Sequence, residues 1–319
     1  MSETKKRFEE LLRFRFSHLA LATVSTLMAL VLSSQLTLAQ QPNQHVFHSP
    51  EEASAALFAA AQHTDNRSLL EILSPAGKDI VSSGDPAEDR RNRDNFVAKY
   101  AQMHRVARER DSVMILYIGA ENWPYPIPLV EKNSVWYFDT DAGKGEILAR
   151  RVGRNELATI DVCYQLVDAE GRQYARANDG EHRYALKFGG NNDVQDGLLS
   201  SENEEQSVIP HDALIASARV ENGTATSQDP VPFNGYYFRI LTAQGNNAEG
   251  GPKSYLGSGK MVSGFAFVAY PAVYRSTGVM TFIVNQNGIV FQKDLGPDTE
   301  KAANAITAFD PDSTWGRVD

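Results

Sequence analysis

The chain has 319 residues, and its 31 Lys and Arg residues against 40 Asp and Glu residues give a formal charge of −9 at pH 7. With 42% hydrophobic and 22% charged residues, it has the composition of a globular protein, which excludes a collagen-like or low-complexity chain. A single cysteine, Cys163, excludes a disulfide scaffold. Because an acidic surface does not attract phosphates, nucleic acid and anionic membranes are not expected partners.

The first 39 residues have the pattern of a secretory signal peptide. Five Lys and Arg residues within positions 5–15 precede an apolar run over residues 19–32, and Ala39 offers a small residue for cleavage. We therefore expect cleavage near Ala39, a periplasmic or secreted location, and no stable membrane span in the mature chain. The alternative is an uncleaved anchor helix, which needs about 20 unbroken apolar residues, whereas Thr23 and Ser25 interrupt this run.

Residues 40–152 are predicted to form helices followed by a curved antiparallel sheet. Ser49 and Pro50, ahead of an alanine-rich run, are typical of a helix start. The predicted helices cover residues 50–61, 67–73 and 89–108. The predicted strands cover residues 113–118, 123–130 and 135–138. Proline at every second position from Pro124 to Pro128 removes donors along one side, which favours an edge strand there. This order of elements resembles the cone-shaped fold of the nuclear-transport-factor-2-like superfamily.

Residues 153–319 are predicted to form a long helix packed on a second antiparallel sheet. After a turn at residues 142–145, residues 146–174 have helical spacing, in one helix or in two that are broken at Gly153. Cys163 is expected to be a small buried residue beside an apolar stripe. That stripe consists of Leu157, Ile160, Tyr164 and Val167. The predicted strands cover residues 235–241, 264–270, 279–284 and 289–293, and a short helix is expected over residues 299–309. Residues 155–296 resemble the head of a bacterial pseudopilin, without the hydrophobic assembly helix of a pilin.

The predicted fold is therefore α+β, with a signal peptide over residues 1–39, a cone-like domain over residues 40–152 and a pseudopilin-head-like domain over residues 153–319. Long motifs within residues 49–315 resemble an uncharacterised bacterial family of exported proteins, the domain of unknown function 2950. These motifs are SGDP at residues 83–86, WPYPIPLV at residues 123–130, and longer stretches at residues 136–157, 235–245 and 264–296. The resemblance implies kinship and assigns no activity.

Seven residues are candidates for ligand binding. They are Trp123, Tyr125, Trp136, Asp139, Asp141, Arg150 and Arg151. We expect the three aromatic residues on the concave side of the N-terminal sheet, either as part of its core or lining the apolar pocket that a cone-shaped fold keeps there. The two acids and the two arginines are spaced to form a structural ion pair or, alternatively, a clamp for a carboxylate or another anion. No serine-hydrolase elbow or complete phosphate-binding loop occurs in the sequence, so no catalytic residue, metal site or cofactor is predicted.

These observations predict an exported protein of the cell envelope that acts as a non-enzymatic binding or assembly module. Its partner would be an envelope protein or a small ligand. The expected contact surfaces are a pocket in the N-terminal domain and an exposed sheet edge in the C-terminal domain. The alternative is an envelope hydrolase that draws an acid/base pair from Asp139, Asp141 and Glu146, which requires a carboxylate with a raised pKa in a cleft.

Overall fold

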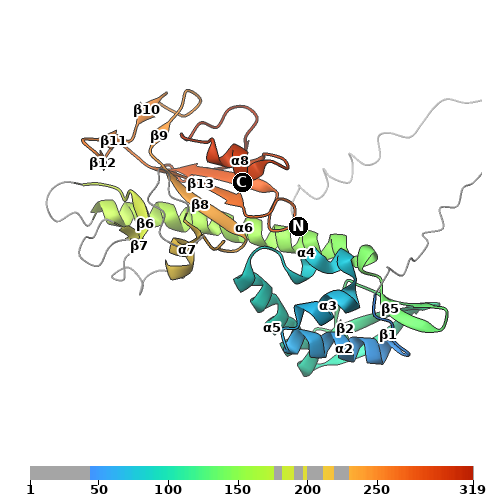
Figure 1. Cartoon of the computed structure of the whole chain (residues 1–319). Helices are drawn as coiled ribbons and strands as arrows, with labels where there is room; N and C mark the ends of the chain where they lie inside the picture. The colour runs from blue at the N-terminus through green and yellow to red at the C-terminus, as the bar shows by residue number, and fades with distance from the viewer. Residues whose placement is uncertain (1–43, 176–181, 190–196, 200–210, 219–229, 319) are drawn as a thin grey trace, which may run out of the picture. The chain divides into compact units, whose positions relative to one another are not determined.

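A computed structural model of the protein describes residues 44–175, 182–189, 197–199, 211–218 and 230–318 (Figure 1). The predicted signal peptide and its cleavage site lie outside the described residues. The helices are α2 (Pro50–Gln62), α3 (Asn66–Leu73), the 3-10 turn η1 (Pro75–Gly77), α4 (Lys78–Val81), α5 (Pro86–Gln102), α6 (Thr140–Ala175), α7 (His211–Ser217) and α8 (Thr299–Asn304). Helices and antiparallel sheets together confirm the predicted α+β class.

The first helices begin where their capping residues stand in the sequence. The Ser49 side chain accepts a hydrogen bond from the Glu52 N–H, and Pro50 occupies the first turn of α2, as predicted. Asp65 caps α3 in the same way through the Ser68 N–H. We call residues 44–139 the N-terminal region and residues 182–318 the C-terminal region. In the N-terminal region, α2, α3 and α5 pack against a five-stranded antiparallel sheet.

That N-terminal sheet has the order β1-β2-β4-β5, with β3 also paired to β2. Its strands are β1 (His104–Arg110), β2 (Val113–Ile118), β3 (Trp123–Pro124), β4 (Leu129–Lys132) and β5 (Val135–Phe138). Two predictions are wrong here. The helix expected to reach residue 108 ends at Gln102, because the following residues pair with β2 along its whole length. The single strand expected over residues 123–130 is interrupted between Pro124 and Leu129, and β4 lies inside the sheet, paired on both sides.

The interruption between β3 and β4 follows from the prolines. Pro126 and Pro128 have no N–H to donate, so this stretch cannot continue the ladder with β2. It bulges out and packs against the first turn of α6 at Gly143. A Cβ at that glycine would lie 2.5 Å from the Pro126 carbonyl oxygen, so only glycine fits there. Just before this bulge, Tyr125 still donates its N–H to the Leu116 carbonyl oxygen of β2 at 2.7 Å, and its ring packs against Phe96 of α5.

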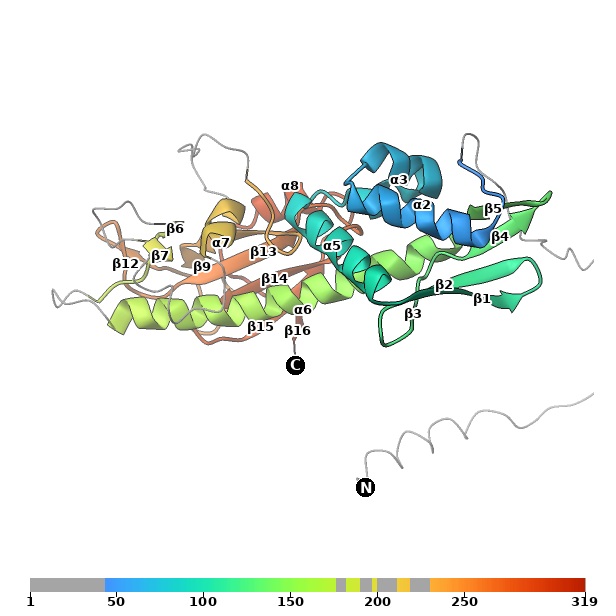
Figure 2. The ribbon, with the colours of Figure 1, turned by 90° about the horizontal axis from the view of Figure 1, so that it is seen from below.

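Helix α6 is one uninterrupted helix of 36 residues, so the turn predicted at residues 142–145 is absent and, of the two alternatives left open at Gly153, the unbroken helix is the one observed. Figure 2 shows it running from the N-terminal region to the C-terminal sheet. It contacts η1 and α4 at one end and β13 and β14 farther along. Cys163 is buried, as predicted, but Leu157 is 68% exposed and Tyr164 40% exposed. The buried stripe is one position away and consists of Val162, Cys163, Leu166 and Ala169.

The C-terminal sheet has the order β16-β15-β14-β13-β8, and each neighbouring pair is antiparallel. Its strands are β8 (Tyr236–Leu241), β13 (Ala266–Pro271), β14 (Met280–Asn285), β15 (Val290–Asp294) and β16 (Gly316–Arg317). Every residue of β13 is buried, which is why this strand is apolar throughout instead of alternating. Figure 2 shows α6 along one face of the sheet and α8 beside the other. The hairpin predicted at Asn287 and Gly288 joins β14 to β15.

Shorter strands complete the described part of the C-terminal region. They are β6 (Lys187–Gly189), β7 (Gly197–Leu199), β9 (Ala243–Gln244), β10 (Lys253–Ser254), β11 (Leu256–Gly257) and β12 (Lys260–Met261). The exposed sheet edge predicted as a contact surface stays a prediction, and the two edges of the described sheet differ. Ala218 bridges Phe238 on one edge and α7 contacts β8, while the opposite edge strand, β16, has two residues.

The hydrophobic residues form separate cores in the two regions. The largest cluster joins the C-terminal sheet to α6 and contains Phe238, Phe267 and Phe282. A second cluster lies between α2, α3 and the N-terminal sheet and includes Leu57 and Phe138. The predicted division into domains at residues 152 and 153 falls inside α6 and stays a prediction. Among the helices of the described residues, none has both the length and the apolar composition needed to cross a bilayer.

Candidate functional site

A pocket of about 420 Å³ opens into the N-terminal region between its helices and the start of α6. Its apolar lining is Leu57, Ala61, Leu69, Leu73, Ile80, Val81, Phe96, Ile118, Trp123, Tyr125, Pro126 and Ile147. Its polar lining is Asp89, Asn92, Arg93, Asn95, Lys99, Arg150, Arg151 and Arg154. The volume and the mixture of many apolar groups with a few polar ones are those of a small-molecule site.

The polar wall that α5 supplies is set by where this helix begins. Asp85 caps it by accepting hydrogen bonds from the N–H groups of Ala87 and Glu88, at 3.0 and 2.9 Å. From that start, Phe96 follows Arg93 by three residues and Asn92 by four, so it shares one face of the helix with both. That face lines the pocket.

The opposing wall comes from α6, where three arginines lie within about one turn of helix. Arg151 is 4% exposed and is held by neutral acceptors, because its Nη1 and Nη2 atoms donate to the carbonyl oxygens of Asp79 and Ile80 at 2.6 and 3.0 Å. Burial lowers the pKa of Arg151, although the nearby carboxylates of Glu88 and Asp89 act in the opposite direction. A guanidinium that satisfies backbone carbonyls in this way joins α4 to α6 and has a structural role.

The other two arginines of α6 are more exposed and each has a carboxylate partner. The Nε atom of Arg150 lies 2.5 Å from Glu146 Oε1, and its guanidinium carbon lies 5.2 Å from the centre of the Trp123 ring. Arg154 donates to Glu88 Oε1 at 3.1 Å and to Asn92 Oδ1 at 3.3 Å. Both side chains can rearrange at the pocket mouth because they are about half exposed.

Two charged residues of α5 differ in how their polar atoms are satisfied. Burial raises the pKa of Asp89, while hydrogen bonds from the Ser83 N–H to both carboxylate oxygens, at 3.2 and 3.1 Å, oppose this shift. Arg93 lies four residues farther along the helix. Its Nε atom is buried and has no hydrogen-bond partner within the described part of the chain. An unsatisfied buried donor costs about 1–3 kcal/mol, more if it is charged.

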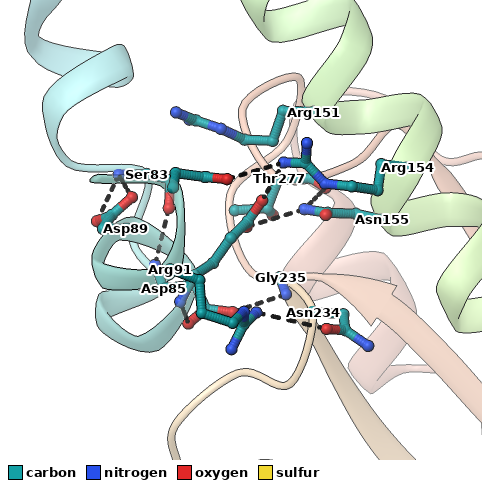
Figure 3. A network of polar contacts seen from close by, with 12 residues as sticks. Ser83, Asp85, Asp89, Arg91, Arg151, Arg154, Asn155, Asn234, Gly235 and Thr277 are labelled. Atoms are coloured by element: carbon teal, nitrogen blue, oxygen red, sulfur yellow. Dashed lines mark hydrogen bonds and ion pairs between the residues drawn. The ribbon is translucent and has the colours of Figure 1, made fainter. Parts of the chain in front are cut away.

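The inner side of the pocket is continuous with a polar network that reaches the C-terminal region (Figure 3). Asp85 uses its second oxygen to accept the Gly235 N–H at 2.9 Å. Asn155 donates from Nδ2 to Glu88 Oε2 at 3.0 Å and to the Thr277 carbonyl oxygen at 3.1 Å. Since Glu88 also pairs with Arg154 of the pocket wall, the same buried carboxylate serves the pocket and the junction.

The structure brings four of the seven predicted ligand-binding residues into this pocket: Trp123, Tyr125, Arg150 and Arg151. The other three lie elsewhere. Trp136 on β5 pairs through its backbone with Phe47 and packs into the N-terminal core. Asp139 accepts the Ala142 N–H at 3.2 Å and so caps α6, and Asp141 is an exposed residue of its first turn. The two arginines were predicted to pair with these acids. Instead, Arg150 pairs with Glu146, and Arg151 donates to two backbone carbonyl oxygens.

Sequence reasoning missed Arg93, Lys99 and Arg154, which complete the cationic part of the lining. A signal for Arg93 was present, since it lies three residues before Phe96 on the same helical face. Arg154 follows Arg150 by one turn and could have been found by the same spacing. What the sequence could not show was that the faces of α5 and α6 meet across a cavity.

The fold and the pocket define an α+β protein with a mixed apolar and cationic cavity in its N-terminal half. Residues 44–318 match the sequence model of the family described as a protein of unknown function (DUF2950). The chain therefore belongs to this family, as the motifs in its sequence predicted. No curated protein and no solved structure matches it significantly, so the likenesses to the nuclear-transport-factor-2-like fold and to a pseudopilin head are not confirmed.

Proposed function

We propose that this protein is an exported, non-enzymatic binding module that takes a small organic ligand into its N-terminal pocket. The observation that carries the proposal is the cavity of about 420 Å³, whose floor is apolar and whose polar groups gather on α5 and α6. Sites of this size and composition bury most of a small ligand's surface. The leader over residues 1–39, with its basic start and apolar run, supports export.

The rigidity of the surroundings supports binding as well. Arg151 and Asp85 fix the two helices that form the polar walls, and Gly143 lets the Tyr125–Pro126 segment close against α6. A pocket whose walls are already held in place loses little conformational entropy when a ligand enters.

The alternative, a hydrolase built on acids at the start of α6, has weaker support from the geometry. Asp139 is used as a helix cap, and Glu146 is paired with Arg150 and about half exposed. A general acid needs a carboxyl group with a raised pKa inside the cleft. Asp89 is the only carboxylate among the residues that line the pocket, and both its oxygens already accept the Ser83 N–H.

The proposal can be tested with an uncharged fluorescent amphiphile, N-phenyl-1-naphthylamine, and the mature chain from residue 40. We expect saturable fluorescence enhancement that falls at least about tenfold in affinity when the cavity is filled by Ala61→Phe or, independently, by Ile80→Phe. Ala98→Phe is the matched control, because Ala98 is an exposed residue of α5 that does not line the pocket. Circular dichroism would establish that each variant is folded. Absence of binding, or equal binding by both folded pocket variants, would overturn the proposal.

A further inference from the structure

The charges around the pocket do not balance. Five cations line it: Arg93, Lys99, Arg150, Arg151 and Arg154. Three of them have a carboxylate partner each, namely Glu121 for Lys99, Glu146 for Arg150 and Glu88 for Arg154. Asp89 in the lining is the fourth carboxylate. Five positive charges against four negative ones leave one positive charge that the described residues around the cavity do not neutralise.

The position of that charge follows from the hydrogen bonds. Arg151 satisfies its terminal nitrogens on two backbone carbonyls, and Asp89 approaches it closely enough to favour its charged form. Arg93 is left: its Nε atom is buried, and the described residues supply it with no acceptor. A guanidinium at an apolar cavity binds a carboxylate better than a neutral acceptor, because each hydrogen bond is then assisted by charge.

We infer that the pocket is specific for organic monocarboxylates, which place an apolar chain or ring among Leu57, Leu69 and Ile147 and a carboxylate against Arg93. This inference rests on the proposed function and names its ligand class. A single net charge fits a monoanion, whereas a phosphate monoester, carrying close to two negative charges, would leave a buried charge uncompensated. The side chains of Arg150 and Arg154 are about half exposed, and both can turn toward the carboxylate of the same ligand.

The inference is tested by isothermal titration calorimetry with three probes that share one alkyl chain: decanoate, 1-decanol and decyl phosphate. At pH 7.5, where decanoate is ionised, we expect it to bind at least about tenfold more tightly than 1-decanol and than decyl phosphate. In Arg93→Gln the preference of decanoate over 1-decanol should disappear, with 1-decanol affinity changed less than threefold. Arg90→Gln, at an exposed position of the same helix, should behave as wild type.

The outcomes separate this inference from the proposed function. If 1-decanol binds as tightly as decanoate, or if Arg93→Gln keeps the preference, the pocket binds apolar ligands and the monocarboxylate inference is wrong. If decyl phosphate binds most tightly of the three probes, the monocarboxylate inference is also wrong. If none of the three probes binds and the fluorescent amphiphile also fails, the proposed function itself is wrong. Thermal melting of Arg93→Gln without ligand excludes an unfolded variant as the cause.

Discussion

The two regions of this molecule use their hydrophobic residues differently. In the C-terminal region β13 is buried along its whole length, and large aromatic side chains such as Tyr236, Phe267 and Phe282 have no exposed surface. In the N-terminal region the helices and the sheet pack less completely, and Phe96 and Tyr125 remain partly exposed around a cavity. A filled core contributes stability, and an incompletely filled one contributes a binding site. The contrast supports the proposal that binding and stability are assigned to different parts of one chain.

The largest expected effect compares the same truncation in the two regions. Phe267→Ala removes a side chain with 0% exposure from the centre of β13 and should lower the free energy of unfolding by about 3–5 kcal/mol. Phe96→Ala removes a side chain that already borders empty space and should cost about 1–2 kcal/mol. Urea denaturation of both variants measures the difference. Equal losses would mean that the N-terminal core is as tightly packed as the C-terminal one.

The second effect concerns Glu170, a buried acid of α6 that contacts the C-terminal region at Ala185. Its Oε2 accepts the Ala185 N–H at 2.9 Å, while Oε1 has no partner among the described residues, and burial raises its pKa from 4.5 to about 8. Between these two pH values the folded protein holds a proton that the unfolded chain has released. The contribution of Glu170 to the free energy of unfolding should therefore be greatest below pH 4.5 and should fall by a few kcal/mol as the pH rises to about 8.

Glu170→Gln should remove this part of the pH dependence, because an amide does not titrate. Urea midpoints at pH 5.5, 7 and 8.5 would measure the slope in each protein. Glu249→Gln, at an exposed position, is the control and should retain the wild-type slope. An unchanged slope in Glu170→Gln would show that this carboxyl group is not the one that titrates.

The smallest effect distinguishes two glycines of α6. Gly143→Ala places a Cβ 2.5 Å from the Pro126 carbonyl oxygen and 2.6 Å from the Ile127 Cα atom, so it should destabilise the protein by about 1–3 kcal/mol. A Cβ at Gly153 meets no atom within 4 Å, so Gly153→Ala should stabilise the helix by about 0.5–1 kcal/mol. Thermal melting gives both signs, and a stabilising Gly143→Ala would contradict the close packing of the bulge.

Much of the fold could be predicted from local signals. Ser49 and Pro50 marked the start of α2, and apolar runs marked β2, β8, β13 and β14. The failures arose where tertiary contacts outweighed local preference. Residues 104–110 contain arginine and alanine, which favour helices. They nevertheless form a strand, because the backbone of β2 offers them hydrogen-bond partners along its edge. The sequence left open whether Gly153 breaks α6, and the helix continues through it because one glycine costs a helix only about 1 kcal/mol.

The candidate site was predicted only in part, because it too depends on tertiary contacts. Trp123 and Tyr125 were expected beside a pocket because a cone-shaped fold keeps one on the concave side of its sheet, and both residues line the pocket described above. Trp136 could not be told apart from them, since its burial is decided by the pairing of Phe47 with β5. The ligand inference depends on Arg93, whose buried Nε atom has no hydrogen-bond acceptor among the described residues. Whether an acceptor is present depends on every element that packs around Arg93, so the neighbouring sequence cannot predict it.

Helix α6 also fixes the rotation about its axis between the side chains that contact one half of the molecule and those that contact the other. Arg151 and Arg154 face the N-terminal region, whereas Val162 and Cys163 face the C-terminal core, all on one continuous helix. One residue inserted between these two groups would turn everything after it by about 100° and advance it by about 1.5 Å. The chain could then keep the contacts of one half only. Length changes within residues 156–161 should therefore be far less tolerated than substitutions at the exposed Leu157 in the same stretch.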